Sequence, residues 1–559
     1  MIIENTLAAI AELATLKTLL LMAVGAIAGL IAGSIPGFTI AMAVVLTLPF
    51  TFGMEPAQGI ATMIGVFVGG LSGGLMAGIL IGIPGTPSSV ATTFDGFPLA
   101  RRGEPGYALG LGVWSSFFGG VISSLLLIAV APQLARVGLE FQPWDYFSLI
   151  FFALTVTASL AGENMIKGLI AGALGLVIAT VGEDDITGVK RFDYGVDYLG
   201  EGFAFLPVLI GLFAFSQLMS DIRDRTAARK SLTDMRAVSV RIEHRRAVAT
   251  IMRSWVNTVR SAFIGVFTGV LPAAGSSISN ILAYDQAKKS SKTPGEFGKG
   301  HPDGIIAPEA ANNATAGGAL ITMMALGIPG DVITAVMLGA LLIHDVVPSP
   351  SFIAEQPKIA YAIFIAFFFA NFLVLGLQTV ALRGFVLVTR VRMYVLASII
   401  LVYCGIGVFA LNNIVNDMWT LAIFGVVGYA MRSLGFPLAP MILGVVLGPI
   451  AERWLSRSLA LSTDPLQFIT HPWSLFFIIL SIFSIGFSYY QRERGKKAWT
   501  LAYAPALLLC LTPPLFMMGG VVRPVLAGVM IIAAVWLAVK APRVWKQWQA
   551  DAAAPARQP

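Results

Sequence analysis

Four glycine–proline breaks interrupt apolar sequence, and their residue types suit the binding of an anion. Pro84 follows Ile-Gly-Ile and Pro329 follows Leu-Gly-Ile, while Pro36 and Pro272 each end a Gly-x-x-Pro segment further upstream. Proline removes a backbone donor and clashes with the preceding turn, so an apolar helix should stop and restart at each break. A restarting helix presents unpaired N–H groups and partial positive charge, which favour a carboxylate. We therefore expect a carboxylate-binding cradle at the breaks.

The predicted cradle comprises the residues at and after each break. They are Pro36, Gly37, Thr39, Gly82, Pro84, Gly85, Thr86, Pro87, Ser88, Gly275, Ser276, Ser277, Pro329, Gly330 and Asp331. The hydroxyl groups among them would add donors to a bound carboxylate. The alternative interpretation is that the glycines and prolines only shape the helix breaks and permit tight packing.

Two adjacent asparagines, Asn312 and Asn313, follow Pro308-Glu309 and precede small residues that enter an apolar segment. Amide groups beside freed backbone carbonyls suit either Na⁺ coordination or a hydrogen bond to substrate. We predict both residues as candidates for substrate and coupling-ion binding. The alternative is that one of them caps the next helix.

Asp331 is an acidic residue directly after the second Ile-Pro-Gly element. It fits an ordinary helix N-cap. It also fits a site for a coupling cation, Na⁺ or H⁺, because carboxylates inside membranes often bind one. Replacement by asparagine separates these interpretations through the ion dependence of transport.

The composition indicates which elements position these residues. Of 559 residues, 57% are hydrophobic and 12% are charged, and the mean hydropathy is +0.81. A soluble domain carries about 25% charged residues, so the chain reads as a polytopic membrane protein. Apolar segments at 38–52, 276–283 and 332–343 are too short to span alone, which indicates half-helices or re-entrant hairpins. We predict an all-α fold with about twelve or more spanning and re-entrant segments.

The breaks occur at matching positions in two halves, near residues 20–130 and 257–350. Broken helices that repeat in this way are the best sequence pointer to a transporter's substrate site, and they favour two inverted structural repeats. We divide the chain into a first membrane half, 1–219, a linker, 220–259, a second half, 260–475, and further membrane segments, 476–559. The linker is rich in arginine and lysine, which predicts a cytoplasmic location.

Other functional classes receive less support. No Gly-x-x-x-x-Gly-Lys-Ser/Thr phosphate loop occurs in the sequence, so we do not expect the chain to hydrolyse ATP. We also expect no cofactor other than the coupling ion. No basic domain with a stacking platform indicates nucleic-acid binding. An intramembrane aspartyl protease would need two membrane-buried aspartates that share a proton, and Asp285 and Asp331 are the available pair.

Several motifs are shared with one transporter family. They are Pro-Phe-Thr-Phe-Gly-Met at 49–54, Gly-Ile-Pro-Gly-Thr-Pro at 82–87, Asp-Gly-Phe-Pro at 95–98, Ser-Lys-Thr-Pro-Gly-Glu-Phe-Gly at 291–298, Ala-Pro-Glu-Ala-Ala-Asn-Asn-Ala at 307–314, Leu-Gly-Ile-Pro-Gly at 326–330 and Met-Arg-Ser-Leu-Gly-Phe-Pro at 431–437. With these motifs, residues 20–475 resemble the large membrane subunit of the tripartite tricarboxylate transporters, the TctA family.

The resemblance implies a permease that imports carboxylates into bacteria across the inner membrane, driven by a Na⁺ or H⁺ gradient. It also implies two partners, a small membrane subunit and a periplasmic substrate-binding protein. An elevator-like movement of hairpins against a fixed scaffold is the expected mechanism. The large subunit of a TRAP-type dicarboxylate transporter is the nearest alternative.

Two departures from the family pattern concern the substrate. Asp331 stands where the family usually places a small hydroxyl residue, and a fixed negative charge there would suit a substrate with fewer charges than citrate. The first break continues Phe38-Thr39 where another glycine is common, and Ala273 follows Pro272 in the second half. The word "tricarboxylate" therefore does not fix the substrate.

Overall fold

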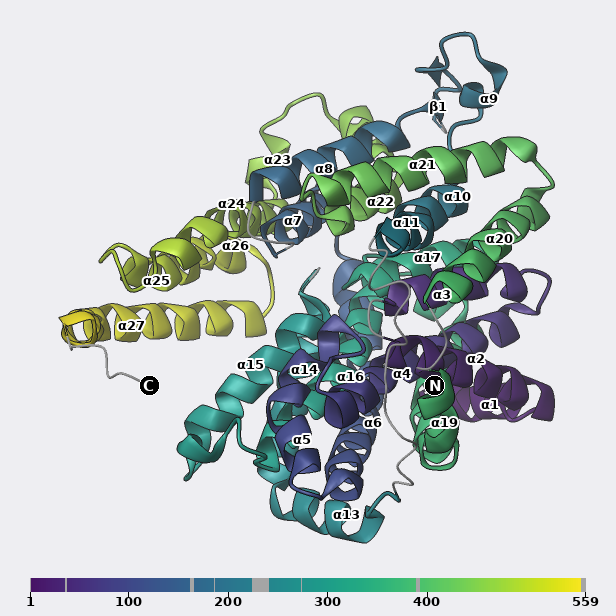
Figure 1. The fold of residues 1–559 in the computed structure, drawn as a ribbon. Coiled ribbons are helices and arrows are strands. Elements are labelled where there is room, and N and C mark those ends of the chain that lie inside the picture. The colour runs from purple at the N-terminus through teal and green to yellow at the C-terminus, as the bar shows by residue number, and fades with distance from the viewer. Residues whose placement is uncertain are drawn as a thin grey trace. The chain divides into compact units, whose positions relative to one another are not determined.

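The computed structural model describes residues 2–35, 38–160, 165–184, 186–223, 241–272, 274–388 and 393–553. These residues are almost entirely helical, as Figure 1 shows, and they confirm the predicted all-α class. Within the described ranges the only strands are β1, Gly182–Glu183, and β2, Lys190–Arg191, which pair antiparallel.

The chain forms two compact units. The first contains Met1–Glu140, Val181–Glu183 and Lys190–Ile442, and the second contains Phe141–Thr180, Asp184–Val189 and Leu443–Pro559. The fourfold division along the chain given above stays a prediction. Residues 224–240 of the basic linker lie outside the described residues.

The first unit opens with the elements that carry the first set of breaks. They are α1 (Ile2–Leu13), α2 (Leu16–Ser34), α3 (Ile40–Thr51), α4 (Pro56–Ile81), the 3₁₀ turn η1 (Pro87–Ser89), α5 (Val90–Arg101) and α6 (Pro105–Gly138). Helix α4 ends at Gly82, whose φ of +77° is the left-handed conformation that glycine adopts without strain.

The second set of breaks lies in the elements that follow the linker. They are α13 (His244–Arg253), α14 (Trp255–Val270), α15 (Gly275–Ser290), η3 (Pro294–Glu296), α16 (Asp303–Leu326), α17 (Val332–Ile343), α18 (Phe352–Glu355) and α19 (Pro357–Val388). Helix α16 ends at Gly327 with φ +72°, as α4 ends at Gly82, and in each case a proline follows two residues later.

The remaining elements of the first unit lie between Asp197 and Arg223 or after α19. They are α9 (Asp197–Gly200), α10 (Phe205–Ile210), the π-helical segment η2 (Gly211–Phe215), α11 (Ser216–Arg223), α20 (Met393–Asn412), α21 (Val415–Ser433) and α22 (Leu438–Leu461). The unit ends five residues into α22, at Ile442. The sequence predicts one apolar segment over 203–219, and the structure fills that region with α10, η2 and α11 in succession.

The second unit contains the rest of α22 and seven helices. These are α7 (Pro143–Leu160), α8 (Met165–Ala179), α23 (Gln467–Thr470), α24 (Pro472–Glu493), α25 (Thr500–Cys510), α26 (Thr512–Met517) and α27 (Val522–Ala553). Nδ1 of His471 lies 2.7 Å from Oδ1 of the buried Asp145, which ties the start of α24 to the start of α7.

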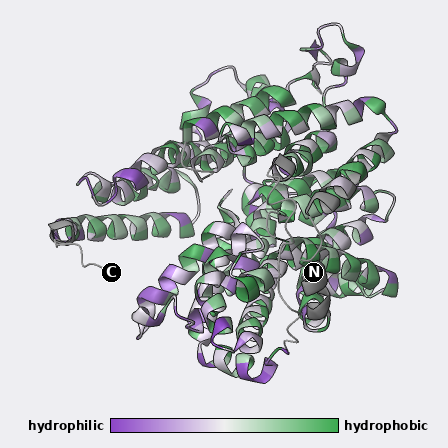
Figure 2. Cartoon of the chain, in the orientation of Figure 1, coloured by the Kyte–Doolittle hydropathy of each residue, from purple (hydrophilic) through white to green (hydrophobic). Residues whose placement is uncertain are grey.

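Within the described residues, eight helical stretches are long and apolar enough to cross a membrane. They are Leu16–Ser34, Pro56–Ile81, Pro105–Gly138, Pro357–Val380, Leu438–Leu461, Pro472–Glu493, Thr500–Met517 and Val522–Lys546. Shorter apolar helices include α3 and α17, which occupy two of the segments predicted to be too short to span. The chain is a multi-pass membrane protein. In Figure 2 hydrophilic residues gather along α13 and toward the end of α15, while most other helices are apolar.

Helices α4 and α16 form the centre of the first unit. The apolar stretch of α4 is 89% buried, and nearly every residue of α16 is buried as well. Helix α4 packs on α2, while α16 packs on α6 and α14. Small residues permit this approach, since a Cβ added to Gly119 of α6 would lie 2.1 Å from the Ala310 carbonyl oxygen of α16. Of the predicted site residues, Asn312 and Asn313 lie on the buried helix α16, and Gly82 lies directly after α4.

Candidate functional site

The two Ile-Pro-Gly breaks are built alike. A Cβ added to Gly85 would lie 2.2 Å from the carbonyl oxygen of Gly33, and one added to Gly330 would lie 2.2 Å from the carbonyl oxygen of Gly269. The first break also touches Gly74 of α4. Each break thus rests against the end of the preceding small-residue helix, α2 or α14, at a distance that excludes any side chain.

The same two breaks start their next helices with capping boxes. At the first, Ser89 Oγ accepts from the Thr86 backbone nitrogen at 3.4 Å, and the Thr86 hydroxyl lies 2.9 Å from Ser88 Oγ. At the second, Asp331 Oδ1 accepts from the Thr334 backbone nitrogen at 2.8 Å. Both cap residues are buried. Asp331 is the N-cap of α17, which is the first of the interpretations drawn from the sequence.

The remaining residues of these breaks lie where the chain turns. Gly82 ends α4, and Pro84 lies between α4 and η1. Pro87 is exposed as the first residue of η1, whereas Ser88 and Pro329 are buried. The structure therefore assembles the predicted residues into two equivalent turns of backbone.

The upstream breaks also precede helix starts. Thr39 is the N-cap of α3 and accepts from the Met42 backbone nitrogen at 3.1 Å. Gly275 begins α15 with φ +59°, and Ser276 is buried while Ser277 is partly buried. Pro36 and Gly37 lie outside the described residues.

The two sets of breaks interlock across the first unit. Helix α15, from the second set, contacts η1 and α5 of the first. Helix α3, from the first set, contacts α17 of the second. Gly275 faces Asp331, because a Cβ added to Gly275 would lie 3.8 Å from the Asp331 Cβ. Each predicted half of the cradle is therefore completed by a helix from the other half.

Asn312 and Asn313 reach from α16 to the middle of α4. The Asn312 Nδ2 donates to the Leu71 carbonyl oxygen at 3.1 Å, and the Asn313 Nδ2 donates to Ser72 Oγ at 2.8 Å. The amide oxygens of both asparagines are buried and have no hydrogen-bond partner within the described part of the chain. Neither asparagine caps a helix, because both lie in the interior of α16.

Glu309 is a functional candidate to which the sequence analysis assigns no role. Its Oε1 accepts from the Thr92 hydroxyl of α5 at 2.5 Å, and its Oε2 accepts from the Ser116 hydroxyl of α6 at 2.8 Å. Asn280 of α15 joins the group, since its Oδ1 accepts from the Ala91 backbone nitrogen at 2.7 Å and its Nδ2 reaches the Pro308 carbonyl oxygen. In the sequence, Glu309 is a carboxylate within an apolar run, and this is the signal that could have identified it.

Asp95 of α5 forms a second cross-contact that the sequence analysis did not assign. Its Oδ1 accepts from the backbone nitrogens of Gly298, Gly300 and His301, at 2.9, 2.7 and 2.7 Å. Its Oδ2 accepts from the Tyr284 hydroxyl of α15 at 2.9 Å. The carboxylate is fully buried. It fixes the segment that connects α15 to α16, and so the start of the helix that carries Glu309 and the asparagines.

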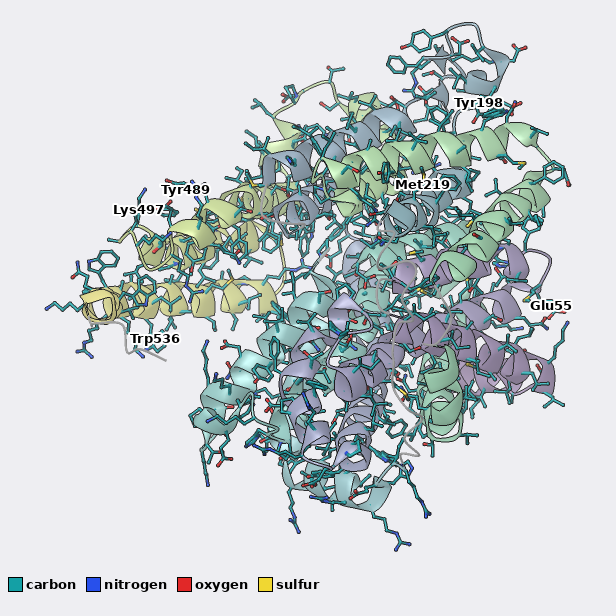
Figure 3. The ribbon with its side chains drawn as sticks, in the orientation of Figure 1. Glu55, Tyr198, Met219, Tyr489, Lys497 and Trp536 are labelled. Carbon is teal, nitrogen blue, oxygen red and sulfur yellow. The ribbon has the colours of Figure 1, made fainter. Side chains whose placement is uncertain are left out.

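Two further polar side chains with a buried atom are His344, directly after α17, and Gln58 of α4. The Nε2 of His344 and the Oε1 of Gln58 are buried, with no hydrogen-bond partner within the described ranges. The Gln58 Nε2 donates to Oε2 of Glu55 at 2.9 Å, and Glu55 lies at the edge of the ribbon in Figure 3. Gly59 faces the His344 ring, since a Cβ there would lie 2.6 Å from Nε2. Burial lowers the pKa of His344, so the neutral imidazole is the form that fits.

The two aspartates considered for a protease have separate partners in the part of the chain that the structure describes. Asp285 is exposed and pairs with Lys289, while Asp331 is buried and capped by Thr334, so each aspartate has its own partner. Among the described residues, no group of three His, Cys, Asp or Glu side chains converges on one point. Cys404 and Cys510 are both free thiols.

Comparison with known proteins identifies relatives over most of the chain. The model of the family described as "Tripartite tricarboxylate transporter TctA family" matches residues 19–443. An uncharacterized 52.8 kDa protein in the TAR-I ttuC' 3' region of Agrobacterium vitis is 31% identical over 415 residues, which cover 72% of this chain and 78% of that protein. An uncharacterized protein in the TAR-II ttuC' 3' region of the same organism is 30% identical over 234 residues, which cover 42% of this chain and 97% of that protein. No solved structure matches the chain significantly.

Proposed function

The chain belongs to the tripartite tricarboxylate transporter TctA family, and from that membership we propose that it is the large permease subunit of a transporter that imports carboxylates. The substrate is a tricarboxylate or another organic acid, bound from one side of the membrane and released on the other. Membership in a transporter family also indicates a transporter rather than an enzyme.

The observation that supports this proposal best is the structural match between the two breaks. Thr86 and Asp331 each form a capping box, Thr86 at the 3₁₀ turn η1 and Asp331 at α17, and Gly85 and Gly330 each pack on a carbonyl oxygen near the end of α2 or α14. Paired broken helices are typical of secondary transporters, in which unpaired N–H groups at the restart bind an anionic substrate. In our proposal the carboxylate binds to the backbone that follows residues 36–37, 84–85, 272 and 329–330, with hydroxyl donors from Thr86, Ser88, Ser276 and Ser277.

The driving force in this proposal is a cation gradient, Na⁺ or H⁺. The asparagines Asn312 and Asn313, together with Asp331, are the predicted residues for the coupling ion. The interlocked helices would move as one body against a scaffold in an elevator-like cycle. The repeats have opposite orientations in the membrane in this mechanism.

The proposal includes the partners of such systems. TctA proteins belong to tripartite transporters that also have a small membrane subunit and a substrate-binding protein. We propose that this chain works with both, in the inner membrane of a bacterium, and receives its substrate from a periplasmic binding protein. The TctA match replaces the TRAP-type alternative as the family of the chain.

Reconstitution tests the function directly. The chain is incorporated into vesicles with its small subunit, the binding protein is added outside, and uptake of labelled citrate is measured with and without an imposed Na⁺ gradient. Uptake that accumulates only with a cation gradient supports coupled import. Equilibration without accumulation under every gradient would instead indicate a channel. If a functional complex accumulates other organic acids but not citrate, the substrate assignment changes while the function stands.

A further inference from the structure

Glu309 places a carboxylate in the interior of the first unit without a basic partner. The residue is fully buried, and within the described residues its hydrogen-bond partners are the hydroxyls of Thr92 and Ser116 and the side chain of Asn312. No lysine, arginine or histidine forms an ion pair with it among those residues. Buried charges in proteins are paired with a counter-charge or coordinate a metal. The site therefore has an unmet requirement for one positive charge.

Two further buried oxygen atoms, which lack a hydrogen-bond partner within the described residues, lie on the same helix. Glu309, Asn312 and Asn313 occupy positions i, i+3 and i+4 of α16, which places them on one face. Because α4 holds the amide nitrogens of both asparagines, their Oδ1 atoms remain as unused acceptors, and both side chains are at least 97% buried. The Asn312 side chain also contacts the Glu309 carboxylate.

The oxygen atoms of Glu309, Asn312 and Asn313 suit some cations better than others. A proton on Glu309 would neutralise the carboxylate but would supply only one donor, which leaves at least one amide oxygen without a partner. A hard metal cation accepts a carboxylate and several amide oxygens together. A single carboxylate balances one positive charge, which favours a monovalent ion over Ca²⁺ or Mg²⁺.

We propose that Glu309, Asn312 and Asn313 bind one Na⁺ ion, with Thr92 and Ser116 as positioning residues that orient the carboxylate. The site deepens the proposed function, on which its role as the coupling site rests, and it assigns Asp331 to helix capping instead. The surrounding groups come from both sets of elements, because α4, α5 and α6 belong to the first and α16 to the second. Binding of Na⁺ would therefore hold the two sets together.

The test uses the purified full-length chain in detergent and needs neither substrate nor partner. Thermal unfolding is followed in increasing NaCl, with choline chloride keeping the ionic strength constant and KCl as the comparison ion. A ligand that binds only the folded state stabilises it by RT ln(1 + [L]/Kd), so the unfolding temperature begins to rise near Kd and then increases with the logarithm of the ion concentration. We expect a rise with Na⁺ that K⁺ does not reproduce and that Glu309→Gln abolishes. Glu355→Gln is the matched control, because Glu355 is exposed at the end of α18.

A second variant keeps the experiment decisive if Glu309→Gln does not fold. Ser116→Ala retains the charge and removes one group that orients it, so the Na⁺ concentration at which the unfolding temperature begins to rise should increase by about 10–100-fold. Equal stabilisation by Na⁺ and K⁺, or a Na⁺ effect unchanged in Glu309→Gln or in Ser116→Ala, would overturn the proposal. Stabilisation that depends on pH but not on Na⁺ would also overturn the proposal, because it would make Glu309 a proton-binding site. Because vesicle uptake is measured separately, Na⁺ binding without carboxylate uptake would reject the proposed function and leave the ion site standing.

Discussion

The Oδ1 atom of Asp95 lies 2.7 Å from the backbone nitrogen of Gly300, which is 205 residues further along the chain. The contact joins α5 to the segment that leads into α16. Gly300 has φ +99°, and a Cβ there would lie 3.2 Å from Leu99 of the same helix α5. The carboxylate and the glycine therefore set how closely the two sets of elements approach.

Replacing Asp95 with alanine should destabilise the folded chain strongly. The change leaves three backbone N–H groups and the Tyr284 hydroxyl without their acceptor, so we expect a loss of about 3 kcal/mol or more. Tyr284→Phe removes one of these donors and should cost about 1 kcal/mol. Thermal unfolding of the purified variants gives the comparison. Equal losses for the two variants would contradict the assigned role of Asp95.

Alanine at Gly85 or at Gly330 should have closely similar effects. The added methyl group would meet a backbone carbonyl oxygen at 2.2 Å in either case, and overpacking against backbone costs about 3 kcal/mol or more. Gly295→Ala is the control, since no atom lies within 4 Å of a Cβ there. Folded yield after detergent extraction, measured by size-exclusion chromatography, tests all three. If only one break were sensitive, the two breaks would not be equivalent in their contribution to folding.

Asp331→Asn should leave the ion dependence of transport unchanged. Asparagine is an N-cap residue as good as aspartate, so the contact with the Thr334 backbone nitrogen is retained while the charge is lost. Asp331→Ala should instead cost about 1 kcal/mol of stability through loss of the cap. The Na⁺ dependence of uptake in vesicles measures the first effect. A changed ion dependence in the asparagine variant would return Asp331 to the coupling site.

His344 should make the stability of the chain depend on pH. Because burial lowers its pKa, protonation is more favourable in the unfolded state, whose histidine titrates near about 6.5. The stabilising contribution is therefore present above that value and is lost as the pH falls through it. His344→Gln should flatten this dependence. Unfolding temperatures at a series of pH values, compared between the two proteins, provide the measurement, and an identical slope in both would remove His344 as the cause.

The elements around the breaks could be predicted well from the sequence, because their signals are local. Proline and left-handed glycine end helices by their own geometry, so the restarts near Thr86 and Asp331 and the short helix α17 follow from residue types alone. The apolar composition likewise gave the all-α membrane class. The N-cap role of Asp331 could also be predicted, because an aspartate directly after a helix break is a local signal.

The contacts between the halves could not be predicted in this way. The hydrogen bonds from Thr92 and Ser116 to Glu309, and from the 298–301 segment to Asp95, join residues that are about 200 positions apart. Their formation depends on how α5 and α6 dock against α15 and α16, which no local pattern encodes. The buried oxygens of Asn312 and Asn313 depend on the same docking, since α4 determines which amide atom is used. The substrate cradle stays a prediction.

The interlocked contacts of α3 with α17, and of α15 with η1 and α5, have a consequence for unfolding. Elements of each set pack on elements of the other set as well as on those of their own. Loosening one set therefore removes contacts from the other, and the two sets should unfold as one cooperative unit rather than one after the other.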